Sequence, residues 1–182
     1  MLDKIEKILI TEEELQHRIR ELGAEITRDY ADKNPVIVGV LKGVVFFYAD
    51  LVRQIKIPCE MAFLTLKSYE GTESTGKVRV LQDIATEIKG RHVLILEDIF
   101  DTGNSLDFTY RYILGHEPAS VKVCTLLDKP ARRSANITLK ADYTGFTIDD
   151  YFVIGYGLDY NQYYRNLPFI GIPKPEVYMK KE

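Results

Sequence analysis

The most informative segment of this sequence is a run of acidic, hydroxyl-bearing and glycine residues behind an aliphatic stretch. Glu97 and Asp98 end the run 93–96, and the turn that follows is rich in small polar residues: Asp101, Thr102, Gly103, Asn104 and Ser105. Backbone N–H groups at a helix N-terminus, aided by hydroxyls, bind phosphate, and a glycine lets the backbone approach the anion. The turn therefore predicts a phosphate cradle at the start of a helix.

The two adjacent carboxylates need their own explanation, because they would repel a phosphate. Carboxylates accept hydrogen bonds from ribose hydroxyls and hold Mg²⁺ directly or through its waters. Glu97 and Asp98 thus indicate a ribose-phosphate site with a metal nearby. The alternative is an ordinary strand–turn–helix with Asp101 as the helix cap. A cap explains Asp101 or Ser105, but not the two carboxylates at the end of the strand.

The elements that must position this segment alternate strands with helices. Thr11 and Glu14 form a capping-box pattern before apolar residues at helical spacing, which predicts a helix over 12–31. Further helices are expected over about 44–55 and from Gly103 to Gly115. Strands are expected over 35–41, 60–66, 92–96, 120–127 and 151–156. Continuous aliphatic strands alternating with helices predict an α/β fold with a mostly parallel sheet.

Two parts of the chain do not fit this alternation. Residues 67–82 are polar and include two glycines, which is typical of a functional or mobile loop. The first helix and the aromatic stretch beyond Tyr151 are expected to form a small subdomain over the carboxyl edge of the sheet. Such folds bind ligands at that edge.

Composition limits the class of protein. The chain has 182 residues, 46% of them hydrophobic, and a net charge of −3, which suits one globular domain and not a nucleic-acid binder held by bulk charge. No apolar run approaches the roughly 20 residues of a membrane span, and no signal peptide is evident, so we expect a cytoplasmic protein. Cys59 and Cys124 lack metal-binding spacing and are expected to be reduced, buried thiols.

The motif at the end of the third strand resembles that of a known family. Glu97–Gly103 is similar to the phosphoribosylpyrophosphate (PRPP) motif of type I phosphoribosyltransferases. Four further stretches resemble the narrower family of hypoxanthine (guanine) phosphoribosyltransferases: Val40–Gly43, Leu66–Tyr69, Asp128–Lys129 and Tyr151–Arg165. Phe100 stands where an aliphatic residue is usual, and Ser105 replaces a common threonine.

The resemblance implies a fold and a domain plan. It implies a type I phosphoribosyltransferase-like core of about residues 33–150, in which helices flank a mostly parallel sheet. A small hood would come from the N-terminal segment and about residues 151–182, within one domain over 1–182.

The resemblance also implies roles for the PRPP side of the site. Asp101 would be the catalytic base, and Glu97, Asp98 and residues 101–105 would bind the ribose phosphate and a metal. Lys42 and Gly43 would bind pyrophosphate after an often cis peptide, and Arg165 would contact the same group. Ser68 and Tyr69 would head a flexible loop that closes over the reacting centre.

The purine side would come from the C-terminal half of the chain. Lys129 would donate to the exocyclic oxygen of a 6-oxopurine, Phe152 would stack on the base, and Val153 would present its backbone. Asp159 would lie at the purine side and coordinate a second Mg²⁺. From the residues alone, simpler alternatives stay open: a solvated Lys129 and a Phe152 that packs or forms an oligomer contact.

The activity implied is purine salvage: hypoxanthine or guanine reacts with PRPP in the presence of Mg²⁺ to give IMP or GMP and pyrophosphate. The partners implied are these small molecules and further copies of the chain, in a homodimer or homotetramer, with no nucleic acid and no membrane. The alternatives are a PRPP-sensing regulator and a transferase for xanthine or a pyrimidine.

Overall fold

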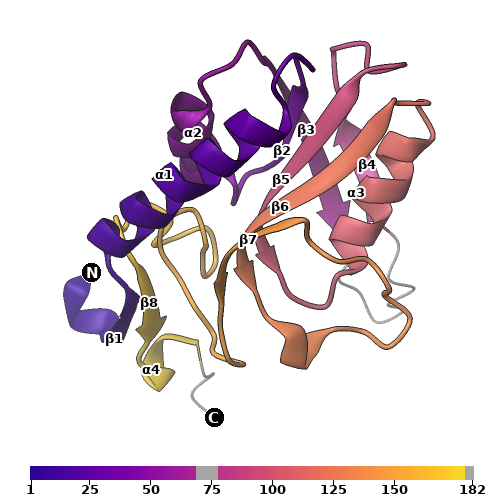
Figure 1. Cartoon of the computed structure of the whole chain (residues 1–182). Helices are drawn as coiled ribbons and strands as arrows, with labels where there is room; N and C mark the ends of the chain where they lie inside the picture. The colour runs from indigo at the N-terminus through magenta and orange to yellow at the C-terminus, as the bar shows by residue number, and fades with distance from the viewer. Residues whose placement is uncertain (69–77, 179–182) are drawn as a thin grey trace.

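The computed structural model describes residues 1–68 and 78–178 (Figure 1). Tyr69 and most of the expected closing loop lie outside the described residues. No helix in the described part of the chain is long and apolar enough to cross a membrane.

The centre of the molecule is a six-stranded sheet in the order β4-β3-β2-β5-β6-β7. Its strands are β2 (Val36–Leu41), β3 (Glu60–Ser68), β4 (Val78–Gln82), β5 (His92–Phe100), β6 (Ser120–Asp128) and β7 (Tyr143–Thr147). All pair in parallel except β4, which is antiparallel to β3. The expected α/β class with a mostly parallel sheet is confirmed.

Helices cover both faces of this sheet, as Figure 1 shows: α1 (Glu12–Asp29) and α2 (Val45–Gln54) on one face, and α3 (Asn104–Leu114) on the other. The capping box at the start of α1 is present, since Thr11 accepts from the Glu14 N–H and the Glu14 carboxylate accepts from the Thr11 N–H at 2.8 Å. The alternation of side chains along each strand gives each face its own core.

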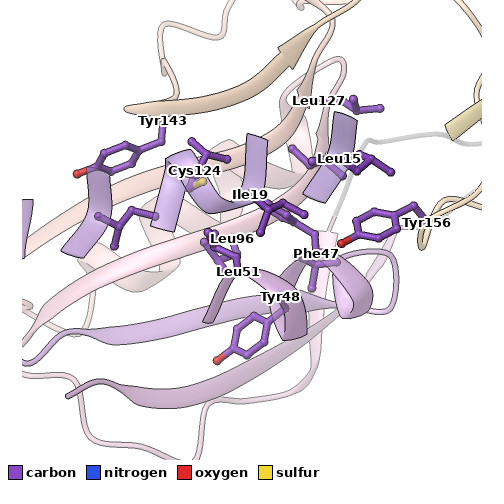
Figure 2. Packing of buried hydrophobic residues seen from close by; sticks show 14 of the residues in the cluster. Leu15, Ile19, Phe47, Tyr48, Leu51, Leu96, Cys124, Leu127, Tyr143 and Tyr156 are labelled. Atoms are coloured by element: carbon purple, nitrogen blue, oxygen red, sulfur yellow. The ribbon is translucent and has the colours of Figure 1, made fainter. Parts of the chain in front are cut away.

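The core beneath α1 and α2 is the larger one. Leu15 and Ile19 of α1 and Phe47 of α2 pack over Leu96 and Cys124 of the sheet, all fully buried (Figure 2). On the opposite face, the strand residues that alternate with these in the sequence are buried against α3. A sheet covered on both sides explains why its strands are continuous aliphatic runs.

A second, two-stranded antiparallel sheet joins the chain ends. It consists of β1 (Ile5–Ile10) and β8 (Ile170–Pro173), flanked by the 3₁₀ turn η1 (Leu2–Lys4) and the short helix α4 (Pro175–Tyr178). The segment between Asp150 and β8 rests on α2, where the Tyr156 hydroxyl donates to the Asp50 carboxylate at 2.6 Å.

Two sequence-based expectations about elements are wrong. The strand after β6 is β7, not residues 151–156, in which Ile154 and Gly155 form only isolated backbone bridges, to Gly171 and Leu158. The positive φ of Gly155 (+99°) and Tyr156 (+50°) ends any extended run there. Helix α1 packs on the large sheet instead of over its edge.

The expected loop over 67–82 is also partly wrong, because its ends are strand. Ser68 pairs with Val78 and Lys67 with Arg79. Val78 and Val80 point inward with Arg79 exposed between them, and this period-two pattern is typical of an edge strand.

Candidate active site

The order in which successive strands are added to the sheet reverses between β2 and β5. From β2 it passes through α2 to β3 on one side, and from β5 through α3 to β6 on the other, although β2 and β5 are neighbours. Ligands of open α/β sheets bind at such a switch point, outside the carboxyl ends of the strands. The residues after β2 and β5, Lys42–Gly43 and the turn 101–105, therefore meet at one place.

The loop of Lys42 and Gly43 packs closely against β5 and against the segment of Gly157. A Cβ atom added at Gly43 would overlap the Asp98 carboxylate, and a Cβ added at Gly157 would overlap the Gly43 carbonyl. Glycine is therefore required at position 157, where the overlap is with backbone, whereas a side chain at position 43 would displace the Asp98 carboxylate. The peptide between Leu41 and Lys42 is cis, as the family resemblance implied.

The turn after β5 has the form of an anion cradle. Gly103 has φ +89° and precedes α3, and the first amide of the helix to donate to a described carbonyl is that of Asp107, to Gly103 at 2.8 Å. Within the described chain, the N–H groups of residues 102–106 thus have no acceptor, as is normal for a helix N-terminus. These amides and the side chains of Thr102 and Ser105 surround a cavity of about 190 Å³.

One buried carboxylate, that of Glu97, lines this cavity, and the half-buried carboxylate of Asp98 follows it on β5. Glu97 is only 8% exposed, and its Oε2 atom has no hydrogen-bond partner among the described residues. Burial raises the pKa of Glu97 well above its ordinary value, with the nearby Asp98 charge as a smaller cause. Burial likewise raises the pKa of Asp98 to about 6, although its carboxylate accepts from the Ile99 N–H at 2.9 Å.

Asp101 lies at the rim of the cavity and does not cap the helix. The N-terminal cap of α3 is Gly103, without a side-chain cap bond, so the alternative role of Asp101 as a cap is wrong. The Asp101 Oδ1 atom lies 3.2 Å from Arg132 Nε but accepts no aligned hydrogen bond in the described structure. Arg132 also faces Asp150, at 3.6 Å.

Lys129 is a buried lysine at the end of β6. It is 4% exposed, its Nζ donates to the Tyr151 carbonyl at 2.9 Å, and it lies 3.1 Å from the Asp150 carboxylate. The attraction of Lys129 lowers the pKa of Asp150. The alternative of a solvated surface lysine is therefore wrong.

Phe152 offers an accessible ring beside this lysine. It is 41% exposed and contacts Tyr160 edge-on, with ring centroids 6.0 Å apart, and Tyr178 at a tilt, with centroids 5.0 Å apart. Val153, the next residue, is buried. The ring is thus held by other aromatic side chains while much of its surface stays open to a planar ligand.

A group of charges follows Gly157. Arg165 donates to the Gly157 carbonyl at 2.6 Å and pairs with Asp159 at 2.8 Å, and Asp159 also accepts from the Gln162 N–H at 2.7 Å. Because Gly157 lies against Gly43, Arg165 comes next to the loop of Lys42. Lys42 and Arg165 line one cavity of about 640 Å³.

The structure thus brings together most of the residues singled out from the sequence. Ser68 is the last residue of β3, and Tyr69 lies outside the described residues. Sequence reasoning missed Arg132, Arg133, Asp150 and Gly157. The signal was present for the two arginines, since they form a basic cluster with Lys129 just after a buried strand.

A model of one protein family matches residues 7–161 of the chain, and its description is phosphoribosyl transferase domain. The chain belongs to this family. The chain is 49% identical over 181 residues to the hypoxanthine-guanine phosphoribosyltransferase of Lactococcus lactis, covering 98% of this chain and 97% of that protein. It is 46% identical to the hypoxanthine-guanine-xanthine phosphoribosyltransferase of Tritrichomonas foetus, covering 98% and 97%.

A solved structure agrees with this assignment. The crystal structure of a hypoxanthine phosphoribosyltransferase from Staphylococcus aureus superposes on this chain with a TM-score of 0.94 and 45% identity, covering 99% of this chain and 97% of that one. The bifunctional protein TilS/HprT of Listeria innocua is 50% identical over 179 residues. That match covers 98% of this chain but only 27% of the Listeria protein.

The residues present fit a divalent metal that takes few ligands from protein. Among the described residues, no group of three or more metal-binding side chains occurs. Glu97 and Asp98 nevertheless form an acidic pair in which Glu97 is buried and keeps an unpartnered oxygen, and a cation would neutralise this pair. Mg²⁺ binds in this way, through one or two carboxylates plus waters and substrate phosphates. At a second metal position, the Asp159 carboxylate would bind the metal and keep its ion pair with Arg165.

Proposed function

We propose that this protein transfers the 5-phosphoribosyl group of PRPP to hypoxanthine or guanine, giving IMP or GMP and pyrophosphate. The observation that carries the proposal is the meeting, at one sheet edge, of an anion cradle, two adjacent carboxylates of which one is buried, and a buried lysine beside an exposed ring. The full-length relatives named hypoxanthine-guanine phosphoribosyltransferases support it.

The base would bind between Phe152 and Lys129. A purine stacks on the open face of Phe152, and the Lys129 ammonium donates to the oxygen at position 6. Val153 presents its backbone to the edge of the base. These contacts fix the ring so that its imidazole nitrogen points toward the ribose.

The ribose phosphate would bind in the cradle at the start of α3. The amides of residues 102–105 and the hydroxyls of Thr102 and Ser105 donate to the 5-phosphate. Glu97 and Asp98 accept from ribose hydroxyls. Asp101, at the rim, takes the proton from the imidazole nitrogen as the new bond forms, in the role of general base.

The pyrophosphate would leave toward Lys42, Gly43 and Arg165. Two cations and a backbone amide next to a glycine provide donors for the departing anion. Mg²⁺, when bound by Glu97 and Asp98 and by Asp159, supplies further neutralisation of this charge. Ser68 and Tyr69 would head the segment that closes over the centre and excludes water, as the family resemblance implies.

Xanthine is a second candidate substrate, because the Tritrichomonas foetus relative is named for all three bases. The deciding experiment is a PRPP-dependent assay run in parallel with hypoxanthine, guanine, xanthine and adenine. We expect turnover of hypoxanthine or guanine and rejection of adenine. Turnover of adenine alone, or of no purine, would refute the proposal. A homo-oligomer and a cytoplasmic location stay predictions.

A further inference from the structure

The segment after β6 runs alongside the turn after β5. The Lys129 N–H donates to the Phe100 carbonyl at 3.0 Å, the Arg133 guanidinium to the Asp101 carbonyl at 2.7 Å, and the Ser134 N–H to the Thr102 carbonyl at 3.0 Å. Three successive carbonyls are thus bound by one segment, residues 129–134, which we call the strap. It includes the turn η2 (Pro130–Arg132).

Within the strap, Arg133 makes the only side-chain contact to these carbonyls in the described structure. Its guanidinium carbon lies 3.1 Å from the centre of the Phe100 ring, and its other nitrogen pairs with the Asp128 carboxylate. The side chain is 17% exposed, so the stack is largely shielded from water. A cation over an aromatic face is attracted by the ring quadrupole, more strongly where water is excluded.

The ring of Phe100 lies directly beneath the cradle. A Cβ added at Gly103 would lie 2.8 Å from Phe100 Cε2 and 3.3 Å from Arg133 Cδ. Phe100 is 2% exposed and belongs to the core on the α3 face. The left-handed glycine, the ring and the guanidinium therefore form one packed unit, so the position of Arg133 is coupled to the shape of the turn.

We propose that Arg133, stacked on Phe100, is a positioning residue for the phosphate of PRPP. By binding the Asp101 carbonyl from outside, it holds the carbonyls of the turn away from the ligand, and the amides of residues 102–105 face the anion. Residue 100 takes part through its aromatic face, which an aliphatic residue cannot supply. The inference rests on the proposed function only in naming PRPP as the source of the phosphate.

The test measures phosphate binding without any purine. Ribose 5-phosphate is titrated into wild type, Arg133→Lys and Phe100→Ile by calorimetry. Lysine keeps the charge but loses the planar fork, and isoleucine keeps an apolar side chain but loses the aromatic face. We expect binding about two- to thirtyfold weaker in each variant, the range of one shielded cation–π contact.

The matched control is Arg111→Lys, an exposed arginine on α3 that pairs with Asp107. It should bind ribose 5-phosphate like wild type. In steady-state assays, Arg133→Lys should raise the KM for PRPP and leave kcat and the KM for hypoxanthine near wild type. A merely structural role would lower the thermal midpoint without this split between the two KM values.

Several results would overturn the inference. These are wild-type affinity in Arg133→Lys, equal weakening of both KM values, or no binding of ribose 5-phosphate to wild type. If Arg133→Lys fails to fold, Phe100→Ile tests the inference instead. Wild-type affinity for ribose 5-phosphate in Phe100→Ile would show that the stack of Arg133 on Phe100 does not contribute to phosphate binding. If wild type binds ribose 5-phosphate but transfers the phosphoribosyl group to no purine, the proposed function is refuted. The ratio of the ribose 5-phosphate affinities of wild type and the variants would then still test the role of Arg133.

Discussion

The choice of base should depend on the one N–H donor of the Lys129 ammonium that has no protein partner among the described residues. An ammonium has three donors and no acceptor, and the structure directs one to the Tyr151 carbonyl and one to the Asp150 carboxylate. The third can bond the oxygen of hypoxanthine but not the amino group of adenine. Leaving one buried donor without a partner costs about 1–3 kcal/mol, or roughly 5- to 150-fold in kcat/KM. The selectivity from Lys129 is therefore moderate, because two of its donors keep their partners.

The variant Lys129→Gln tests this reasoning, because its amide can either donate or accept. We expect its kcat/KM for hypoxanthine to fall by roughly 5- to 150-fold, while that for adenine changes little, so the ratio between the bases narrows. Lys122→Gln is the matched control, since Lys122 lies on β6, the strand that Lys129 follows, and contacts Tyr143 instead of the site. An unchanged ratio of kcat/KM for hypoxanthine and adenine in Lys129→Gln would refute the reasoning. Base selection would then be expected to depend on the backbone near Val153.

Three further predictions concern the carboxylates. Asp101→Asn should lower kcat by roughly 10²–10⁴ with little change in the KM for PRPP, and near-normal turnover would exclude it as the base. Excess chelator should abolish transfer, and added Mg²⁺ should restore it; full activity in chelator would contradict the acidic pair as a metal site. Because burial raises the pKa of Asp98 from 3.8 to about 6, folded protein binds its proton more tightly than unfolded chain, and stability falls as the pH rises through this range. Metal-free Asp98→Asn should therefore melt higher than wild type at about pH 7.5 but not at about pH 4, by calorimetry, while losing PRPP-dependent activity; a lower midpoint at about pH 7.5 would contradict the assigned cause.

Local signals in the sequence were sufficient for the elements that form the core. The capping box of Thr11 and Glu14 and the apolar spacing behind it predicted α1 to within two residues of its observed end. The aliphatic runs of β2, β5 and β6 predicted buried parallel strands, because a sheet covered on both faces excludes polar residues from its centre. The order of acid, hydroxyl and glycine residues after β5 predicted the cradle, because a helix N-terminus binds anions through its own backbone.

Those local signals did not predict the edge strand β7. β7 contains a glycine at position 145 because a Cβ there would lie 2.5 Å from the Leu126 carbonyl oxygen, and this close approach exists only once β6 is in place. Conversely, the apolar run 151–156 resembles a strand but leaves the extended conformation at Gly155. An edge strand pairs on one side and is only partly buried, so its composition carries little information.

The electrostatics of the site were decided by tertiary structure alone. The sequence determined which charged residues this protein has, and it placed Glu97, Asp101 and Lys129 after strands. Only the fold determined that Glu97 loses its water, that Lys129 is buried against Asp150, and that Arg133 stacks on Phe100. These properties depend on desolvation and on distances between residues that are far apart in the sequence, which local sequence does not encode.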